Sequence, residues 1–114
     1  MRRANIALNK RIEIGNVVAD SEKYAVYSDT KYIELPKKEF ELLFKLLSYP
    51  DRIFSKEQLL DSIWGVNAVS GEDTVKTHIS RIRNKLRDIE EINIITIKGL
   101  GYKADLREVR AEEA

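Results

Sequence analysis

The 114-residue chain has room for one domain built around one hydrophobic core. Hydrophobic residues make up 43% and charged residues 34% of the sequence, a composition typical of globular proteins that argues against a disordered or membrane protein. Zero cysteines exclude disulfides and thiolate metal sites, and the single histidine leaves little for metal binding, so we expect no metal and no cofactor. The N-terminus has no apolar signal core, so we expect a cytoplasmic protein.

Short β-forming runs dominate the first third of the chain. Residues 1–10 have no sustained hydrophobic period and are interpreted as a linker or tether. Turn-forming residues then separate four runs that are rich in β-branched and aromatic residues. These runs predict a small antiparallel meander with strands at Arg11–Ile14, Val17–Asp20, Tyr24–Ser28 and Lys31–Leu35.

Two helices are predicted next. Pro36 precedes a helix over Lys37–Tyr49, and Pro50 stops it. Apolar residues cover much of its circumference, so we expect it to be sandwiched between other elements. The run Ser55–Gln58 is a capping box that begins a second helix, which continues to about Trp64. Gly65 is expected to end it in a left-handed conformation.

A third helix is predicted from near Glu72 to near Asp88. Its apolar stripe consists of Val75, Ile79, Ile82 and Leu86, which we expect to face the core. The opposite face carries short polar and basic residues along its middle, and cations lie on both shoulders. Such a helix fits the DNA major groove, because its middle can reach base edges while its shoulders meet phosphates. We interpret it as a recognition helix.

A C-terminal hairpin is predicted from Ile94–Ile97 and Tyr102–Asp105, joined through Lys98–Gly101. The two glycines at the turn allow positive φ and a close approach of the backbone to another surface. The predicted domain therefore spans residues 11–105, and residues 106–114 are expected to form a flexible tail.

Charge is distributed unevenly along the chain, although the net charge is only +1. Between Thr74 and Lys103 there are seven basic and three acidic residues, a net charge of +4, whereas the rest of the chain carries −3. This polarity would orient the domain on a polyanion. A solvated helix face is the alternative interpretation of the same charges.

Strands, three helices and a hairpin in this order predict an α+β winged helix-turn-helix with an N-terminal four-stranded antiparallel sheet and a C-terminal wing. The sequence also resembles the DNA-binding effector domain of OmpR/PhoB-family response regulators, over about residues 11–105. The resemblance rests on blocks in the family's order and spacing: Leu35, Glu39–Leu43, Phe54–Leu60, Trp64–Gly65, Thr74–Leu86 and Ile97–Tyr102.

The resemblance implies a non-enzymatic, phosphorylation-controlled transcription regulator that binds direct repeats in double-stranded DNA. It implies base contacts from Thr77, Ser80 and Arg81. It implies phosphate contacts from a second set of residues: Trp64, Thr74, His78, Arg83, Thr96 and Lys98. It also implies that the loop between the second and third helices meets RNA polymerase, here through Val66, Asn67, Ala68, Val69, Ser70 and Gly71.

Three positions depart from the family pattern. Pro36 stands where many members have a threonine, Ser80 where an arginine is common, and Asp73 where some members have a basic residue. Family members also carry a receiver domain and answer to a sensor kinase, and 114 residues cannot hold both domains. We therefore expect an excised DNA-binding half, with a natural stand-alone domain as the alternative.

Rival functions have weaker support in the sequence. A protein-docking winged helix would present an apolar patch on the third helix, whose outward face has no large apolar residue. An RNA-binding domain would need exposed aromatic residues in the wing for stacking. An enzyme would need a nucleophile–base pair, a metal set or a phosphate loop, and we find none in the sequence.

Overall fold

The computed structural model describes residues 10–65 and 71–107. It begins with a four-stranded antiparallel sheet whose strands follow chain order: β1 (Arg11–Ile14), β2 (Val17–Asp20), β3 (Ala25–Tyr27) and β4 (Tyr32–Glu34). The predicted meander is confirmed, with its last two strands shorter at each end. The register aligns Ile12, Ala19, Val26 and Ile33 across the four strands. Ala19 and Val26 are fully buried in this row, so it forms the core side of the sheet.

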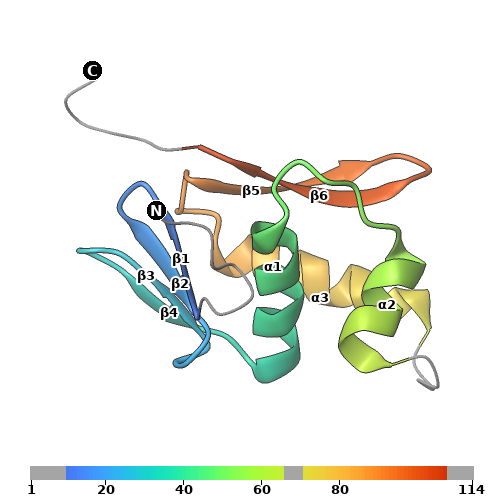
Figure 1. Cartoon of the computed structure of the whole chain (residues 1–114), viewed down its shortest axis with the longest axis horizontal. Coiled ribbons are helices and arrows are strands. Elements are labelled where there is room, and N and C mark those ends of the chain that lie inside the picture. Colours follow the sequence, from blue (N-terminus) through green and yellow to red (C-terminus); the bar gives the residue numbers. More distant parts are fainter. Residues whose placement is uncertain (1–9, 66–70, 108–114) are drawn as a thin grey trace.

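Helix α1 (Lys37–Ser48) lies at the centre of the domain (Figure 1). It ends one residue before the predicted boundary, because Tyr49 already has non-helical angles. Apolar residues cover much of the circumference of α1 because it contacts α2, α3 and β6 on different sides. Phe40, Leu42, Leu43 and Leu46 are at most 1% exposed.

Helix α2 (Lys56–Trp64) begins at the predicted capping box. The backbone N–H of Gln58 donates to Ser55 Oγ at 3.0 Å, and the N–H of Ser55 donates to Gln58 Oε1 at 2.9 Å. Gly65 ends the helix with φ 97° and ψ 157°. The expected positive φ is present, but ψ is extended, so Gly65 does not adopt the predicted left-handed helical conformation.

Helix α3 (Glu72–Lys85) is shorter than predicted, and its expected end at Asp88 is wrong. Leu86 leaves the helix with φ −102° and ψ 12°. Its side chain and that of Ile89 are 3% and 4% exposed. Ile89 continues the helical spacing of the buried stripe, so periodicity alone did not show that the helix ends earlier, and Ile92 is buried after the turn as well.

A C-terminal hairpin completes the domain, formed by β5 (Ile92–Ile97) and β6 (Gly101–Leu106). Both strands are longer than predicted. Strand β6 continues one residue past the predicted boundary at 105, because Leu106 pairs with Ile92, and the N–H of Arg107 donates to the carbonyl of Glu91 at 2.9 Å. Of the expected tether over residues 1–10 and tail over residues 106–114, residues 1–9 and 108–114 lie outside the described residues.

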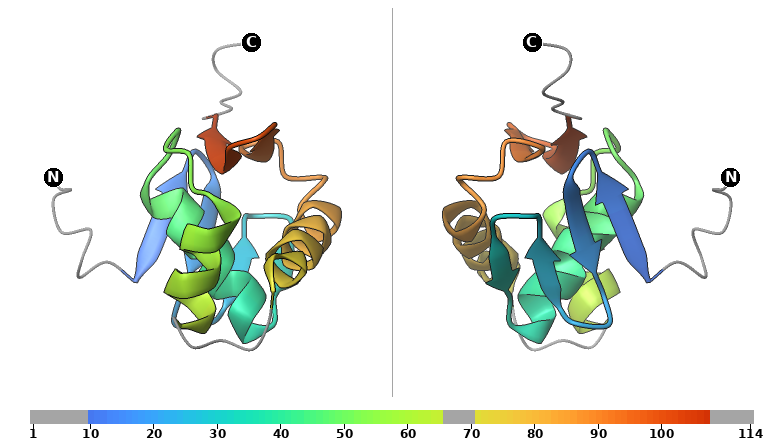
Figure 2. Two further views of the ribbon diagram at one scale, coloured as in Figure 1. Left: turned by 90° about the vertical axis from the view of Figure 1, so that its right-hand side faces the viewer. Right: turned by 90° about the vertical axis from the view of Figure 1, so that its left-hand side faces the viewer.

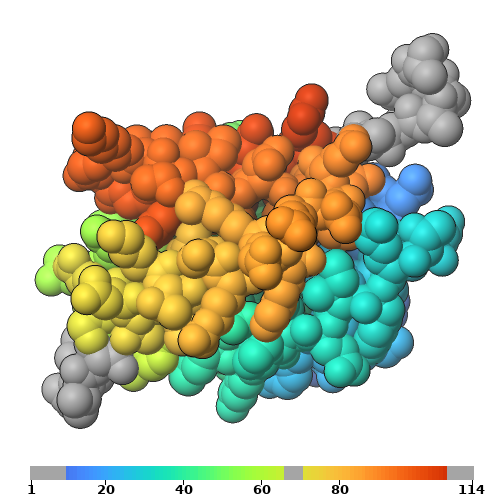
Figure 3. Space-filling model, turned by 180° about the vertical axis from the view of Figure 1, so that it is seen from behind, coloured from blue at the N-terminus to red at the C-terminus, as the bar shows by residue number. Residues whose placement is uncertain are grey.

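Helix α3 and the C-terminal hairpin lie side by side on one face of the domain. Figure 2 shows the sheet on one flank, α1 and α2 together, and α3 on the other side beneath the hairpin. From behind, α3 and the hairpin form one continuous surface (Figure 3). None of the helices in residues 10–65 and 71–107 is long and apolar enough to cross a bilayer.

Candidate nucleic-acid interface

The predicted base-contacting residues lie in a row on the outer face of α3. Val75, Ile79 and Ile82 are at most 1% exposed, so they fix the orientation of the helix on the core. Thr77, Ser80 and Arg81 lie on the opposite side, and all three are exposed. Among the described residues, their side chains form no hydrogen bond or ion pair. The structure therefore brings the three together as predicted and leaves their polar groups available to a ligand.

Three predicted phosphate-contacting residues form one cluster where α2 and α3 meet. The rings of Trp64 and His78 pack edge to face, with their centroids 4.9 Å apart. Nδ1 of His78 lies 2.8 Å from the carbonyl oxygen of Thr74. That oxygen has no proton to give, so Nδ1 must carry the hydrogen and act as the donor. Nε2 is the ring nitrogen that takes no part in this hydrogen bond.

Arg83 and Thr96, also predicted as phosphate contacts, bind each other. Arg83 donates through Nε to the carbonyl of Ile94 at 3.0 Å and through Nη2 to Thr96 Oγ1 at 2.6 Å. Its guanidinium also lies 5.8 Å from the ring centre of Tyr102. Arg83 thereby fastens α3 to the hairpin, a role that the sequence did not reveal. The hydroxyl of Thr96 accepts from Arg83, so its own proton remains available for donation to a phosphate.

The hairpin also forms hydrogen bonds with the connection between α1 and α2. Phe54 and Tyr102 form a β-bridge with N–H···O distances of 2.8 and 2.9 Å. Gly101 has φ 143°, and a Cβ atom there would lie 1.9 Å from the carbonyl oxygen of Phe54. The predicted close approach of the turn to another surface is confirmed at Gly101. Lys98 lies at the exposed tip of this hairpin.

Lys85 is a basic residue of α3 that turns away from the predicted interface. Its Nζ atom lies 2.7 Å from Oε1 of Glu39 in α1. The Glu39 side chain is only 3% exposed, whereas that of Lys85 is 35% exposed. Lys85 therefore compensates a buried carboxylate. The sequence analysis missed this pair, although Glu39 stands three and four residues before Leu42 and Leu43 on the apolar stripe of α1.

The predicted polymerase-facing loop is almost entirely outside the described residues, which exclude Val66–Ser70. Gly71 is described, and it precedes the first residue of α3 with extended backbone angles of φ −96° and ψ −175°. This prediction therefore remains a prediction.

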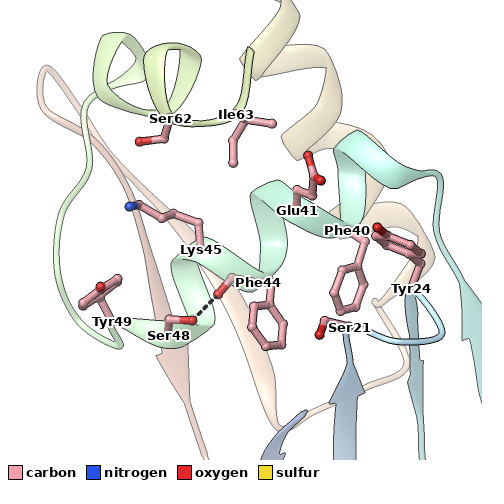
Figure 4. A pocket seen from close by; sticks show the side chains of 10 residues that line it. All are labelled: Ser21, Tyr24, Phe40, Glu41, Phe44, Lys45, Ser48, Tyr49, Ser62 and Ile63. Atoms are coloured by element: carbon pink, nitrogen blue, oxygen red, sulfur yellow. Dashed lines mark hydrogen bonds between the residues drawn. The ribbon is translucent and has the colours of Figure 1, made fainter. Parts of the chain in front are cut away.

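A hollow of about 550 Å³ lies between α1, α2 and the turn after β2 (Figure 4). Aromatic rings and hydroxyl groups line it together with one lysine and one glutamate: Ser21, Tyr24, Phe40, Glu41, Phe44, Lys45, Ser48, Tyr49, Ser62 and Ile63. Ser48 Oγ is engaged with the carbonyl of Phe44 at 2.8 Å. The lining offers no base beside a serine, and in residues 10–65 and 71–107 no cluster of potential metal ligands occurs. The exposed face of α3 takes no part in this hollow.

Helix α3 carries a row of exposed polar side chains, Arg83 holds it beside the hairpin, and Trp64 and His78 form a cluster where it meets α2. This arrangement is typical of winged helix-turn-helix DNA-binding domains. The family model described as "Transcriptional regulatory protein, C terminal" matches residues 29–104. The chain belongs to this family, the DNA-binding output domains of OmpR/PhoB-type response regulators, which regulate transcription and are not enzymes.

Relatives and solved structures agree with this assignment. The heme response regulator HssR of Staphylococcus saprophyticus is 39% identical over 106 residues, which cover 92% of this chain and 47% of HssR. The response regulator DrrB, a Thermotoga maritima OmpR/PhoB homologue, is 33% identical with a TM-score of 0.71, over 85% of this chain and 45% of DrrB. The Klebsiella pneumoniae RstA DNA-binding domain in complex with its RstA box is 26% identical with a TM-score of 0.71, over 85% and 98% of the two chains. The chain spans about half the length of HssR.

Proposed function

We propose that the domain binds double-stranded DNA sequence-specifically, with α3 in the major groove and Thr77, Ser80 and Arg81 at base edges. The observation that carries this proposal is the exposed polar row, which projects from a helix whose other side is fully buried. The guanidinium of Arg81 suits the O6 and N7 atoms of guanine, and the methyl group of Thr77 suits a thymine methyl. Ser80 is shorter than the arginine common at this position in the family, so its contact reaches less far.

Phosphates on the two sides of the groove are contacted by Trp64, Thr74, His78, Arg83, Thr96 and Lys98 in this proposal. Trp64 would donate through its indole N–H, and Arg83 through the nitrogen atoms not engaged by the hairpin. The related RstA DNA-binding domain forms a complex with its RstA box, which supports DNA as the ligand of this domain. These contacts set the register of α3 on the duplex but carry no sequence information themselves.

The rival functions have less support from the geometry. A protein-docking surface on α3 would require large apolar side chains on its outer face, and the exposed positions there are Lys76, Thr77, Ser80, Arg81 and Asn84. An A-form RNA duplex closes its major groove to a helix, so the same row would not reach its bases.

We also propose that the domain works as the output half of a phosphorylation-controlled cytoplasmic regulator, with a receiver domain and a sensor kinase as its partners. The support is the length of the curated relatives, of which this chain spans about half. Direct-repeat sites and an RNA polymerase contact through Val66–Gly71 belong to the same proposal.

Selection from a random pool of duplexes tests the DNA-binding proposal. We expect one enriched sequence motif and, on the selected duplex, a slope of log K against log salt of roughly −2 or steeper, because Arg83 and Lys98 neutralise phosphates and thereby release counterions. Fluorescence anisotropy between about 50 and 200 mM salt measures this slope. Enrichment of no common motif, or a nearly flat salt dependence, would contradict the proposal.

A further inference from the structure

Lys85 and Glu39 form the one ion pair in the described residues that has a buried member. Their atoms Nζ and Oε1 lie 2.7 Å apart, and the Glu39 side chain is 3% exposed. The other pairs within residues 10–65 and 71–107 are longer, at 3.7–4.0 Å, and each of their side chains is at least 28% exposed. Replacing a buried ion pair by apolar residues of similar volume is often neutral for stability, so stability alone does not account for this pair.

Arg83 and Lys85 hold opposite flanks of α3. Residues two positions apart in an α-helix are separated by about 200° around its axis, so these side chains leave the helix on opposite sides. Arg83 donates to β5, and Lys85 donates to Glu39 of α1. The buried apolar stripe of α3 lies between the two flanks. Helix α3 is therefore held between the hairpin and α1 by a directional contact on each side (Figure 2).

These two contacts restrict the rotation of α3 about its own axis. Apolar packing is non-directional, so the buried stripe alone tolerates a small rotation. Side-chain tips lie about 5–6 Å from a helix axis, so a rotation of about 20° moves them by roughly 2 Å. Hydrogen bonds to base edges need donor–acceptor distances of about 2.7–3.2 Å, so a displacement of this size breaks them. The rotational setting of α3 therefore decides whether Thr77, Ser80 and Arg81 reach the bases in the proposed complex.

We propose that Lys85 and Glu39 are positioning residues for sequence recognition: their ion pair sets the rotation of α3 and thereby aligns its exposed polar row with the bases. The pair acts through α3 and makes no DNA contact of its own. Its loss should lower discrimination between sequences more than affinity for DNA in general, because charge attraction to phosphates tolerates small displacements. The inference rests on the proposed DNA-binding function and deepens it.

The test replaces both partners at once, because Lys85→Met alone would leave a buried carboxylate without its cation and destabilise the domain. In the double variant Glu39→Met, Lys85→Met, unbranched apolar side chains fill a similar volume. Fluorescence anisotropy measures its affinity for the duplex selected by the wild type, for single-base changes of that duplex and for a random duplex. We expect discrimination at the base pairs read by α3 to fall roughly tenfold. The urea midpoint and the affinity for the random duplex should stay close to those of the wild type.

Two control proteins separate positioning from charge. Lys85→Arg keeps a cation that can pair with the Glu39 carboxylate, so it should retain most of the discrimination. Lys10→Met, Glu22→Met removes the same two kinds of charge from an exposed pair beside the N-terminal sheet, whose side chains are 66% and 63% exposed. An exposed pair contributes little to structure, so this second double variant should discriminate as the wild type does.

Unchanged discrimination in Glu39→Met, Lys85→Met would overturn the inference, as would an equal fall in Lys10→Met, Glu22→Met. A uniform loss of affinity for all duplexes, with a lowered urea midpoint, would also overturn it, because the pair would then serve stability alone. Failure of the wild type to select any motif would instead contradict the proposed function. The two failures are distinguishable because the selection uses only the wild-type chain, whereas the inference is judged from the variants.

Discussion

The residues assigned to base edges and those assigned to the DNA backbone differ in how firmly the free domain holds them. Thr77, Ser80 and Arg81 project from α3, and within the described residues their side chains have no polar partner. Arg83, by contrast, is fixed to β5 by two hydrogen bonds, and His78 is fixed by Thr74 and Trp64. Arg83 and His78, which position the protein on the DNA backbone, are thus ordered before binding. The base-contacting side chains instead lose conformational entropy when they bind the bases.

Gly101→Ala should have the largest effect, because it disrupts the contact with Phe54 that holds the hairpin, to which Arg83 is bound. An added Cβ meets the Phe54 carbonyl and forces an alanine to φ 143°. We expect unfolding to become easier by about 3 kcal/mol or more, as measured by urea denaturation. Gly99→Ala is the matched control, with positive φ but open space around the Cβ, and should cost only about 1–2 kcal/mol. Equal losses for the two variants would show that the contact with Phe54 is unimportant.

Arg81→Ala tests the residues assigned to base edges. The variant should lose roughly 1–3 kcal/mol of discrimination at one base pair, while its stability in urea stays unchanged because the side chain is exposed. Affinities for the selected duplex and for single-base substitutions of it measure this loss. Uniform weakening on every sequence would mean that Arg81 contacts the backbone rather than a base.

Arg83→Lys separates the positioning role from charge. Lysine keeps the positive charge but cannot reproduce the planar fork that spans Ile94 and Thr96. We expect about fivefold weaker binding to specific and random duplexes alike, with an unchanged salt slope because the charge count is preserved. Arg87→Lys, at an exposed position after α3, is the control and should bind normally. A selective loss at one base pair would contradict a positioning role.

His78→Gln should have the smallest effect. Glutamine keeps an N–H donor but loses the edge-to-face ring contact with Trp64. We expect roughly twofold weaker binding to specific and random duplexes alike, because a phosphate contact carries no sequence information. Affinities for the selected duplex and for a random duplex measure this change, and a loss confined to the selected duplex would contradict a phosphate contact by His78.

Local signals in the sequence were sufficient for most elements of the fold. The capping box at Ser55 located the start of α2, and the stripe of Val75, Ile79 and Ile82 gave the orientation of α3. The end of α3 was missed because Leu86 and Ile89 continue the helical spacing of the buried stripe although the helix ends at Lys85. The length of β6 was underestimated because Leu106 is held by its partner strand rather than by a local signal.

The candidate site was predictable as a set of residues but not as a set of contacts. The exposed row followed from helical periodicity, and the phosphate set followed from the family resemblance. Neither could reveal that Arg83 binds Thr96, or that Lys85 binds Glu39 across 46 positions in the sequence. Such contacts depend on how α3 packs against α1 and the hairpin, which periodicity does not specify.

The pair formed by Lys85 and Glu39 bears on how the domain would search a genome. One cation that the sequence assigns to the DNA-facing helix is paired with the buried carboxylate of Glu39, 2.7 Å away. A phosphate gains little from an ammonium group that is already neutralised. The affinity for random sequences is therefore lower than the number of lysines and arginines implies. The domain would dissociate sooner from wrong sites and sample more of the chromosome before it binds its target site.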